Sequence, residues 1–318
     1  MANITFESAF EAMYHEKYDF SDFISGDISK RVKKRTKIAE KIIYEADPTL
    51  KTYHKFLNLF VLQWLKYNES CVYSYRKGFN VSDAVKKHSA GKYFFQTDLN
   101  NFFGSLSTEL VRKCIIQSIE SIPISDTLQY VDRILDMITI DGWLPVGYST
   151  SPLISNACLL EFDDLLESFC RDHGFTYTRY SDDIIISGGN KELYNIKPAV
   201  EAILKQCFGD TLSLNSAKTK FNSIGNRVII LGMMILPNGS ITIDSKLKNE
   251  IEVLLHFYTK DREKFLDKIN TESNAALTKI SGYLNYINTT DKIYLDKLRR
   301  KYGASVVDMF VRGSVKSL

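Results

Sequence analysis

The stretch from Phe175 to Gly188, FTYTRYSDDIIISG, restricts the fold more than any other part of the chain. β-Branched and aromatic residues on both sides of a short polar centre predict two strands joined by a tight turn. Asp182 and Asp183 lie at that turn, where a solvated pair of acids is the commonest interpretation. The isoleucines that follow predict a buried strand, so the carboxylates would lie at the edge of a core. Adjacent acids repel unless water or a cation offsets their charge, and a hard divalent cation suits their oxygens.

Composition bounds the class of protein. The chain has 318 residues, of which 44% are hydrophobic and 25% charged, as in a globular protein with room for two or three subdomains. No apolar run reaches the length of a membrane span, and the N-terminus lacks the apolar core of a signal peptide. Five scattered cysteines without a CxxC pair fit buried thiols in a reducing compartment. We therefore expect a cytoplasmic protein with no membrane partner.

Basic residues gather in two places, although the net charge is only +3. Residues 30–41, KRVKKRTKIAEK, hold seven basic side chains against one acid, and residues 297–303, KLRRKYG, form a second cluster. Two solvated helix faces would explain both clusters. Two basic patches beside a carboxylate site would also form a footprint for a phosphate backbone.

The order of the expected elements favours an α+β core. Helices are expected over residues 1–28, 52–65, 107–122, 124–141, 154–174 and 190–208, and from residue 244 to the C-terminus; strands are expected over 92–99, on both sides of the turn at 181–183, and as a pair over 227–243. Ser107 is expected as an N-cap and Gly174 as a helix end. Asp163 and Asp164 are interpreted as a solvated helix face. The best subdomain boundary lies near residue 240.

Asp98 is a second place where a carboxylate ends a strand-like apolar run. If its strand pairs with the hairpin, Asp98 and Asp182 meet at one edge and supply oxygen ligands for two cations. Such a site can activate a hydroxyl and stabilise a leaving oxygen in phosphoryl transfer. The chain has no GxxxxGK[ST], GxSxG or HExxH motif, and its five histidines are scattered.

Six motifs resemble those of reverse transcriptases, in the order and spacing of that family over roughly residues 40–235. They are YSDD (180–183), QTDLNNFFGSL (96–106), LPVGYSTSPLISN (144–156), LNSAKT (214–219), IILGMMI (229–235) and KIIYEADPTLK (41–51). The helical tail looks most like that of bacterial retron-type and defence-associated reverse transcriptases. Three positions depart from the pattern: Val146 replaces the Gln of LPQG, and DAVKKH (83–88) and ILG (230–232) replace the NAxxH and VTG signatures of retrons.

The resemblance implies a right-hand polymerase with three parts. An N-terminal helical region and fingers would span residues 1–92, with a further fingers segment around 110–145. A palm with an antiparallel sheet would span 93–240, and a helical thumb 241–318. The length leaves no room for an endonuclease or maturase segment, so intron mobility is not expected.

The resemblance also implies roles at the metal site. Asp98 and Asp182 would be direct ligands of two Mg²⁺ ions, for which Mn²⁺ can substitute. Leu99 would offer its backbone carbonyl, Asp183 would support the pair, and Lys218 would protonate the leaving pyrophosphate.

Further roles concern the nucleotide and the RNA. Phe103 would exclude a 2′-hydroxyl while Phe102 packs in the core, and Gly147 would lie in the nucleotide site. Lys41 would grip the triphosphate, with Arg35 and Lys37 as alternatives. The RNA-binding residues would be Arg76, Lys77, Arg299, Arg300 and Lys301.

The resemblance implies an RNA-directed DNA polymerase that makes complementary DNA from deoxynucleoside triphosphates on an associated non-coding RNA, in antiphage defence. A toxin or effector partner and a homo-oligomer remain open. Val146 keeps a second interpretation open, in which a related defence polymerase extends DNA without a template or primes on its own hydroxyl. A catalytically silent RNA-binding scaffold is the alternative from another class, although clustered acids at a buried edge cost stability without a cation.

Overall fold

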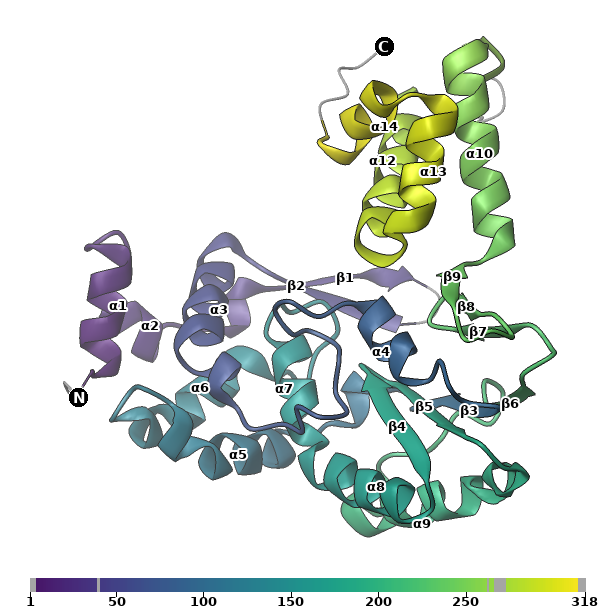
Figure 1. Cartoon of the computed structure of the whole chain (residues 1–318). Coiled ribbons are helices and arrows are strands. Elements are labelled where there is room, and N and C mark those ends of the chain that lie inside the picture. The colour runs from purple at the N-terminus through teal and green to yellow at the C-terminus, as the bar shows by residue number, and fades with distance from the viewer. Residues whose placement is uncertain (1–3, 39–40, 262, 266–272, 314–318) are drawn as a thin grey trace. The chain divides into compact units, whose positions relative to one another are not determined.

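A computed structural model describes residues 4–38, 41–261, 263–265 and 273–313, without the side chains of residues 34–38, 41 and 273–276. The chain divides into two compact units. Unit 1 consists of residues 1–75, 97–184 and 195–219, and unit 2 consists of residues 76–96, 185–194 and 220–318. Both units combine helices with strands, which confirms the α+β class (Figure 1).

Unit 1 contains most of the helices that come early in the chain. Its helices are α1 (Phe6–Tyr14), α2 (Phe20–Ser25), α3 (Pro48–Phe60), α5 (Thr108–Gln117), α6 (Val131–Ile138), α7 (Ser151–Cys158), α8 (Leu160–Asp172) and α9 (Lys197–Phe208); its strands are β1 (Val32–Ile38), β2 (Lys41–Ala46) and β4 (Phe175–Tyr180). Helix α8 packs against β4 and α9. Ser107 caps α5 as expected, because its side chain accepts a hydrogen bond from the backbone N–H of Leu110.

The basic run at residues 30–41 is mainly a β-hairpin and not a helix face. Strands β1 and β2 pair antiparallel, with Val32 opposite Ala46. Val32, Ile42 and Ile43 are β-branched, and such residues favour an extended backbone over a helix. The hairpin ends at Asp47, whose side chain accepts a hydrogen bond from Leu50 N–H and so starts α3.

Strands β3 (Tyr93–Asp98) and β5 (Asp183–Gly188) run through the boundary between the two units. They belong to a four-stranded sheet with the order β4-β5-β3-β6. The expected hairpin around the YSDD turn is confirmed, with β4 before the turn and β5 after it. Asp98 is confirmed as the last residue of its strand.

Unit 2 contains β6 (Lys220–Ser223), a three-stranded sheet and a helical C-terminal part. Its other elements are α4 (Val81–Lys87), β7 (Val228–Ile230), β8 (Met233–Ile235), β9 (Ile241–Ile243), α10 (Ser245–Lys260), α12 (Ser273–Thr290), α13 (Lys292–Tyr302) and α14 (Ala304–Val311). Residues 227–243 therefore form three strands where two were expected. The apolar faces of α10, α12, α13 and α14 bury one core around Leu255, Leu284, Leu295 and Phe310.

Two expected helices are shorter in the structure. Helix α6 covers only Val131–Ile138 of the 124–141 segment, and a 3₁₀ turn precedes it. Helix α8 ends at Asp172, with His173 as its C-cap. Among the described residues, no helix combines the length and the apolar character that spanning a membrane requires.

Candidate active site

Asp98 and the YSDD turn meet at one edge of the sheet within unit 1, as the sequence predicts. The backbone N–H of Leu99 donates to the carbonyl oxygen of Asp182 at 3.2 Å. On the other side, the N–H of Asn215 donates to the carbonyl oxygen of Asp98 at 2.8 Å, which draws in the loop that carries Lys218. Backbone hydrogen bonds thus place Asp98, Asp182, Asp183 and Lys218 around the same strand ends.

The electrostatics of this edge are unfavourable for three anions. Burial, followed by the negative charges of Asp182 and Asp98, raises the pKa of Asp183 to about 6. Asp98 is 4% exposed, and among the described residues nothing forms a hydrogen bond with its buried Oδ1. Its other oxygen, Oδ2, lies 2.5 Å from Nζ of Lys218, whose pKa this hydrogen bond raises. The Lys218 ammonium is therefore the cation that balances Asp98.

The carboxylate oxygens at this edge are ligands of the type that a divalent cation prefers. In the described part of the chain, no group of three or more His, Cys, Asp or Glu side chains lies close enough together to hold a metal ion. Carboxylates without a shared cation repel one another, so they are expected to stand apart. Oδ1 of Asp98 has no hydrogen-bond partner among the described residues, and burial together with two neighbouring anions raises the pKa of Asp183, so added positive charge would stabilise this edge. A hard cation with oxygen ligands would supply it.

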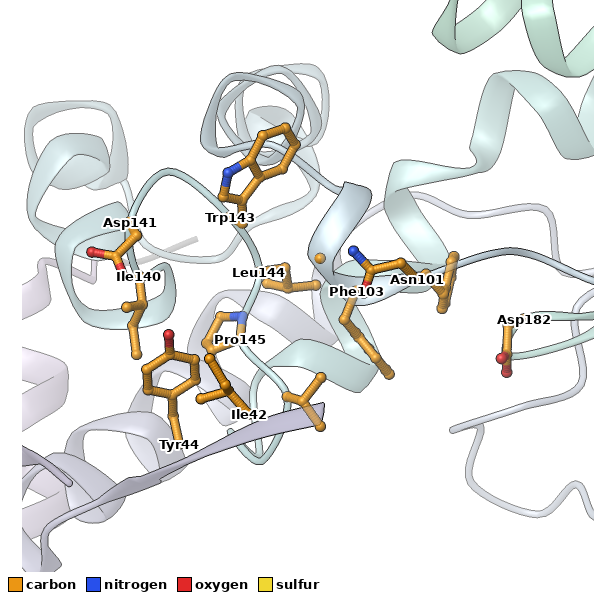
Figure 2. Close-up of a pocket in the computed structure, with 13 residues that line it drawn as sticks. Ile42, Tyr44, Asn101, Phe103, Ile140, Asp141, Trp143, Leu144, Pro145 and Asp182 are labelled. Atoms are coloured by element: carbon orange, nitrogen blue, oxygen red, sulfur yellow. The ribbon is translucent and has the colours of Figure 1, made fainter. Parts of the chain in front are cut away.

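Of Asp98, Asp182 and Asp183, Asp182 lines a cavity of about 510 Å³ in unit 1. Figure 2 shows Ile42 and Tyr44 on β2 facing Pro145 and Phe103, with Asp182 at one end of the group. Phe102 and Phe103 both line this cavity; Phe102 is buried with 4% exposure, and Phe103 is partly exposed. The expected division of roles, with Phe102 in the core and Phe103 at the nucleotide, stays a prediction. The remaining lining residues include Asn101, Gly104, Ile140, Asp141, Trp143, Leu144 and Val146.

The LPVG loop is held against strand β2. The N–H of Tyr44 donates to the carbonyl oxygen of Val146 at 2.9 Å. Gly147 has φ +106°, and a Cβ atom there would collide with the carbonyl oxygen of Tyr44. A glycine is therefore required at 147 for two reasons, its backbone conformation and this close approach. Val146 lines the cavity, and Gly147 does not.

The structure describes only the backbone of the expected triphosphate-binding residues. Lys41 begins β2, and Arg35 and Lys37 lie in β1. Their side chains lie outside the described part of the structure.

The expected RNA-binding residues of α13 are largely engaged within unit 2. Arg299 forms ion pairs with Asp296 and Asp308, each at 2.8 Å. Lys301 pairs with Glu252, and Arg300 donates to the carbonyl oxygen of Asp296 at 3.4 Å. Their charges are therefore partly balanced by neighbouring acids.

Arg76 and Lys77 lie before α4, also in unit 2. The Arg76 guanidinium lies over the ring of Phe79, 4.1 Å from its centroid, and Lys77 is exposed. An arginine on an exposed aromatic ring is suited to contact a nucleic-acid base or phosphate.

The interpretation of Asp163 as part of a solvated helix face is wrong. Asp163 is fully buried and forms an ion pair at 2.6 Å with Arg179, which is also fully buried. Burial alone lowers the pKa of Arg179, but the Asp163 carboxylate more than offsets this, so the pKa is raised and the guanidinium stays charged. Asp164 is exposed as expected. Sequence reasoning missed Arg179, which lies two residues before the YSDD turn's Ser181.

Comparison with known proteins identifies the family. A family model described as reverse transcriptase (RNA-dependent DNA polymerase) matches residues 35–266. The retron Ec83 reverse transcriptase of Escherichia coli is 25% identical over 289 residues, which cover 87% of each chain. The retron Ec73 reverse transcriptase of the same organism is 29% identical over 276 residues, covering 79% of this chain and 82% of that one.

A solved structure of Candida albicans telomerase, in complex with a fragment of telomeric RNA, is 12% identical over 81% of this chain and 47% of that chain. Its TM-score of 0.42 is too low to add to the assignment. The family model spans well over half of the chain, from within β1 to beyond α10. The chain therefore belongs to the reverse transcriptase family, as an RNA-directed DNA polymerase of the bacterial retron type.

Proposed function

We propose that this polymerase works by divalent-metal-dependent phosphoryl transfer at Asp98, Asp182 and Asp183, with two Mg²⁺ ions. The observation that carries the proposal is the buried, unpartnered Oδ1 of Asp98 beside an Asp183 whose pKa is raised to about 6. Asp98 and Asp182 would be the direct ligands, together with the carbonyl oxygen of Leu99, and Asp183 would support them. When bound, the metal would neutralise phosphate charge and favour in-line displacement.

Lys218 has a second role in this proposal. Its ammonium holds Asp98 Oδ2 in the structure, and its side chain is 67% exposed, so it is free to turn outward. If Asp98 held the metal, the Lys218 ammonium would no longer be needed as its counter-ion. Lys218 would then be released toward the leaving pyrophosphate, to which it would donate a proton.

The cavity in Figure 2 is the proposed site of the incoming nucleotide. Its position between β2 and Asp182 would place the triphosphate near the carboxylates. Phe103 would lie against the sugar and exclude a 2′-hydroxyl, which selects deoxynucleotides. Gly147 would keep the LPVG loop close to β2, and Lys41 would bind the triphosphate.

The biological setting is also proposed. The template would be an associated non-coding RNA and the role antiphage defence, as the motifs of the sequence imply; the similarity to two retron reverse transcriptases supports DNA synthesis on an RNA template. Arg76, Lys77, Arg299, Arg300 and Lys301 would contact the RNA. The fingers, palm and thumb would divide near residues 92 and 240. A toxin partner and a homo-oligomer belong to the same proposal, as does a cytoplasmic location.

Sequencing of the nucleic acids that co-purify with the protein tests the function. We expect RNA before deoxynucleotides and Mg²⁺ are added, and DNA complementary to that RNA afterwards. The Asp182→Asn variant should bind the same RNA and make no DNA. DNA synthesis by this variant at the wild-type rate would reject the proposed site.

A second outcome would favour untemplated synthesis. Val146 lines the cavity where the resembled motif has Gln, so the contact to the incoming sugar differs here. A DNA product with no matching RNA, or one attached to a tyrosine of the protein, would support the template-independent or protein-primed alternative. Membership of a polymerase family favours either enzyme over a silent scaffold.

A further inference from the structure

The YSDD turn has a backbone conformation that needs support. Ser181 has φ +59°, in the left-handed region that residues with a side chain seldom adopt, and it is 9% exposed. Asp182 follows directly, so the conformation of Ser181 decides where the Asp182 carboxylate points. A conformation of this kind persists only when the surrounding structure fixes it.

Arg179 fixes the turn from inside the core. Its Nη1 donates to the carbonyl oxygen of Ser181 at 2.9 Å. The other edge of the guanidinium is bound by Asp163, with Nε to Oδ1 at 2.9 Å and Nη2 to Oδ2 at 2.6 Å. The hydroxyl of Tyr177 donates to the same Asp163 Oδ1 at 2.7 Å. The planar guanidinium therefore connects the turn to α8.

Ser74 and Asn156 hold the other side of Ser181. The N–H of Ser181 donates to Oγ of Ser74 at 2.8 Å, and that hydroxyl donates to Oδ1 of Asn156 at 3.2 Å. Nδ2 of Asn156 donates back to the carbonyl oxygen of Ser74 at 2.9 Å, and Arg179 Nη1 reaches Asn156 Oδ1 at 3.3 Å. We call Ser74, Asn156, Asp163 and Arg179 the turn network. It binds both the N–H and the carbonyl oxygen of Ser181.

The charge of Arg179 is already balanced, so the residue acts on the turn through geometry. Asp163 takes two of its donor positions, and both side chains are fully buried. A buried ion pair seldom stabilises a protein more than apolar residues of similar size would. The Arg179–Asp163 pair also fixes the backbone of Ser181 through the hydrogen bond from Nη1. Two apolar residues could not form that hydrogen bond.

We propose that Arg179 is a positioning residue for DNA synthesis, which sets the left-handed Ser181 through the turn network and thereby aims the Asp182 carboxylate at the metal. This inference rests on the proposed function, in which Asp182 is a metal ligand. A weaker network should leave RNA binding and folding largely intact while it loosens the metal site. Groups that orient a ligand in this way typically change metal affinity or activity about 10- to 100-fold when they are replaced.

The test measures DNA synthesis by the full-length protein on its co-purified RNA as a function of Mg²⁺ concentration. Arg179→Lys keeps the charge opposite Asp163, but its single ammonium cannot donate to Asp163 and to the Ser181 carbonyl with the geometry of a guanidinium. The double variant Arg179→Met/Asp163→Leu removes the pair without leaving a lone charge. Ser74→Ala removes only the hydroxyl that binds Ser181 N–H. Asp164→Asn is the matched control, because it changes the exposed neighbour of Asp163.

We expect the Mg²⁺ concentration at half-maximal rate to rise about 10- to 100-fold in the turn-network variants, with kcat reduced on a similar scale. RNA affinity should stay within about twofold, and Asp164→Asn should match the wild type. An unshifted Mg²⁺ titration in any turn-network variant that folds overturns the inference. If Arg179→Lys does not fold, the double variant and Ser74→Ala decide.

Asp182→Asn separates this inference from the proposed function. If it is inactive at every Mg²⁺ concentration while the turn-network variants behave like the wild type, only the positioning role of Arg179 fails. If Asp182→Asn is active, the proposed site itself fails.

Discussion

The chain contains two Asp-Asp pairs, and their environments are opposite. Asp163 of the first pair is fully buried on α8 and is bound by Arg179, while its neighbour Asp164 faces solvent. Asp182 and Asp183 of the second pair are partly exposed at the end of the sheet, and Asp183 faces the charges of Asp182 and Asp98. The same dipeptide therefore serves the core in one place and the proposed chemistry in the other.

The difference lies in where the compensating cation comes from. At Asp163 the Arg179 guanidinium balances the negative charge, so this carboxylate needs no cation from outside the chain. At the second pair the protein cation that acts on Asp183, among the described residues, is the ammonium of Lys218, which binds Asp98 and is mostly exposed. A carboxylate that keeps its charge without a fixed partner is available for a ligand. The burial of the opposing cation is thus a better guide to role than the burial of the acid.

The largest expected effect separates the two pairs by activity. Asp182→Asn removes the negative charge of a proposed metal ligand and should lower the rate of DNA synthesis by at least about 10³-fold. Asp164→Asn makes the same change in the other pair and should leave the rate within about twofold of the wild type. Primer-extension rates at saturating deoxynucleotide measure both. An equal loss of rate in the two variants would show that the two Asp-Asp pairs do not differ in their role in DNA synthesis.

The next effect separates the pairs by stability. Asp163→Ala leaves the Arg179 charge buried without its partner, so the free energy of unfolding should fall by about 3–5 kcal/mol. Asp182→Ala, at a partly exposed site, should change it by less than about 1 kcal/mol. Urea denaturation followed by circular dichroism gives both values. A cost for Asp163→Ala as small as that for Asp182→Ala would show that the buried pair is dispensable.

A smaller effect concerns pH. The pKa of Asp183 is raised from 3.8 to about 6, so the folded protein favours the protonated acid more than the unfolded chain does. The resulting stability is fully present below pH 3.8 and is lost as the pH rises through about 6.

Asp183→Asn should remove this pH dependence. It should raise the stability at pH 8 by about 1 kcal/mol, less than the full shift would give, because the side chain is partly exposed. Thermal unfolding between pH 4 and pH 8, with Asp164→Asn as control, provides the measurement. A profile for Asp183→Asn that parallels the wild type would contradict the assignment.

The smallest effect concerns Lys218. Lys218→Ala breaks an ion pair that is largely exposed on the lysine side, so the unfolding free energy should change by no more than about 1 kcal/mol. The variant should also bind Mg²⁺ more tightly in the absence of nucleotide, because a competing cation is gone. Calorimetric titration with Mg²⁺ measures this. Weaker Mg²⁺ binding would mean that Lys218 helps to assemble the site.

The active-site edge could be predicted from the sequence because its signals are local. A strand-forming run that ends in an acid, and a polar turn between two such runs, are both readable within a few residues. Asp98 and the YSDD turn were found in this way. The pairing of their strands then brought them together, as the hydrogen bond from Leu99 to Asp182 shows.

The turn network could not be predicted with the same reasoning, because its members come from four separate segments. A signal was nevertheless present. Arg179 alternates with Phe175 and Tyr177 on one face of β4, and a charge on such a face requires a buried acid. Asp163 precedes Leu166 by three residues and Cys170 by seven, which puts it on the apolar face of α8. The charged composition of this segment favours a solvated pair of acids. The helical periodicity instead predicts that Asp163 is buried.

The β1–β2 hairpin was missed for a different reason. The number of lysines and arginines at residues 30–41 suggested a solvated helix face, since long basic side chains are common there. The β-branched residues between them carried the structural information. The basic residues indicate that this segment has a charged surface. The β-branched residues determine that its backbone is extended.

The cavity beside Phe103 has a pharmacological consequence. Its volume of about 510 Å³ lies in the range of small-molecule binding sites. Tyr44, Trp143 and Pro145 give it walls that a rigid aromatic compound could fill without resembling a nucleotide. A compound bound there would occupy the proposed nucleotide site between β2 and the LPVG loop. It would block DNA synthesis and leave the RNA bound. Such an inhibitor would separate what the bound RNA does from what its DNA copy does.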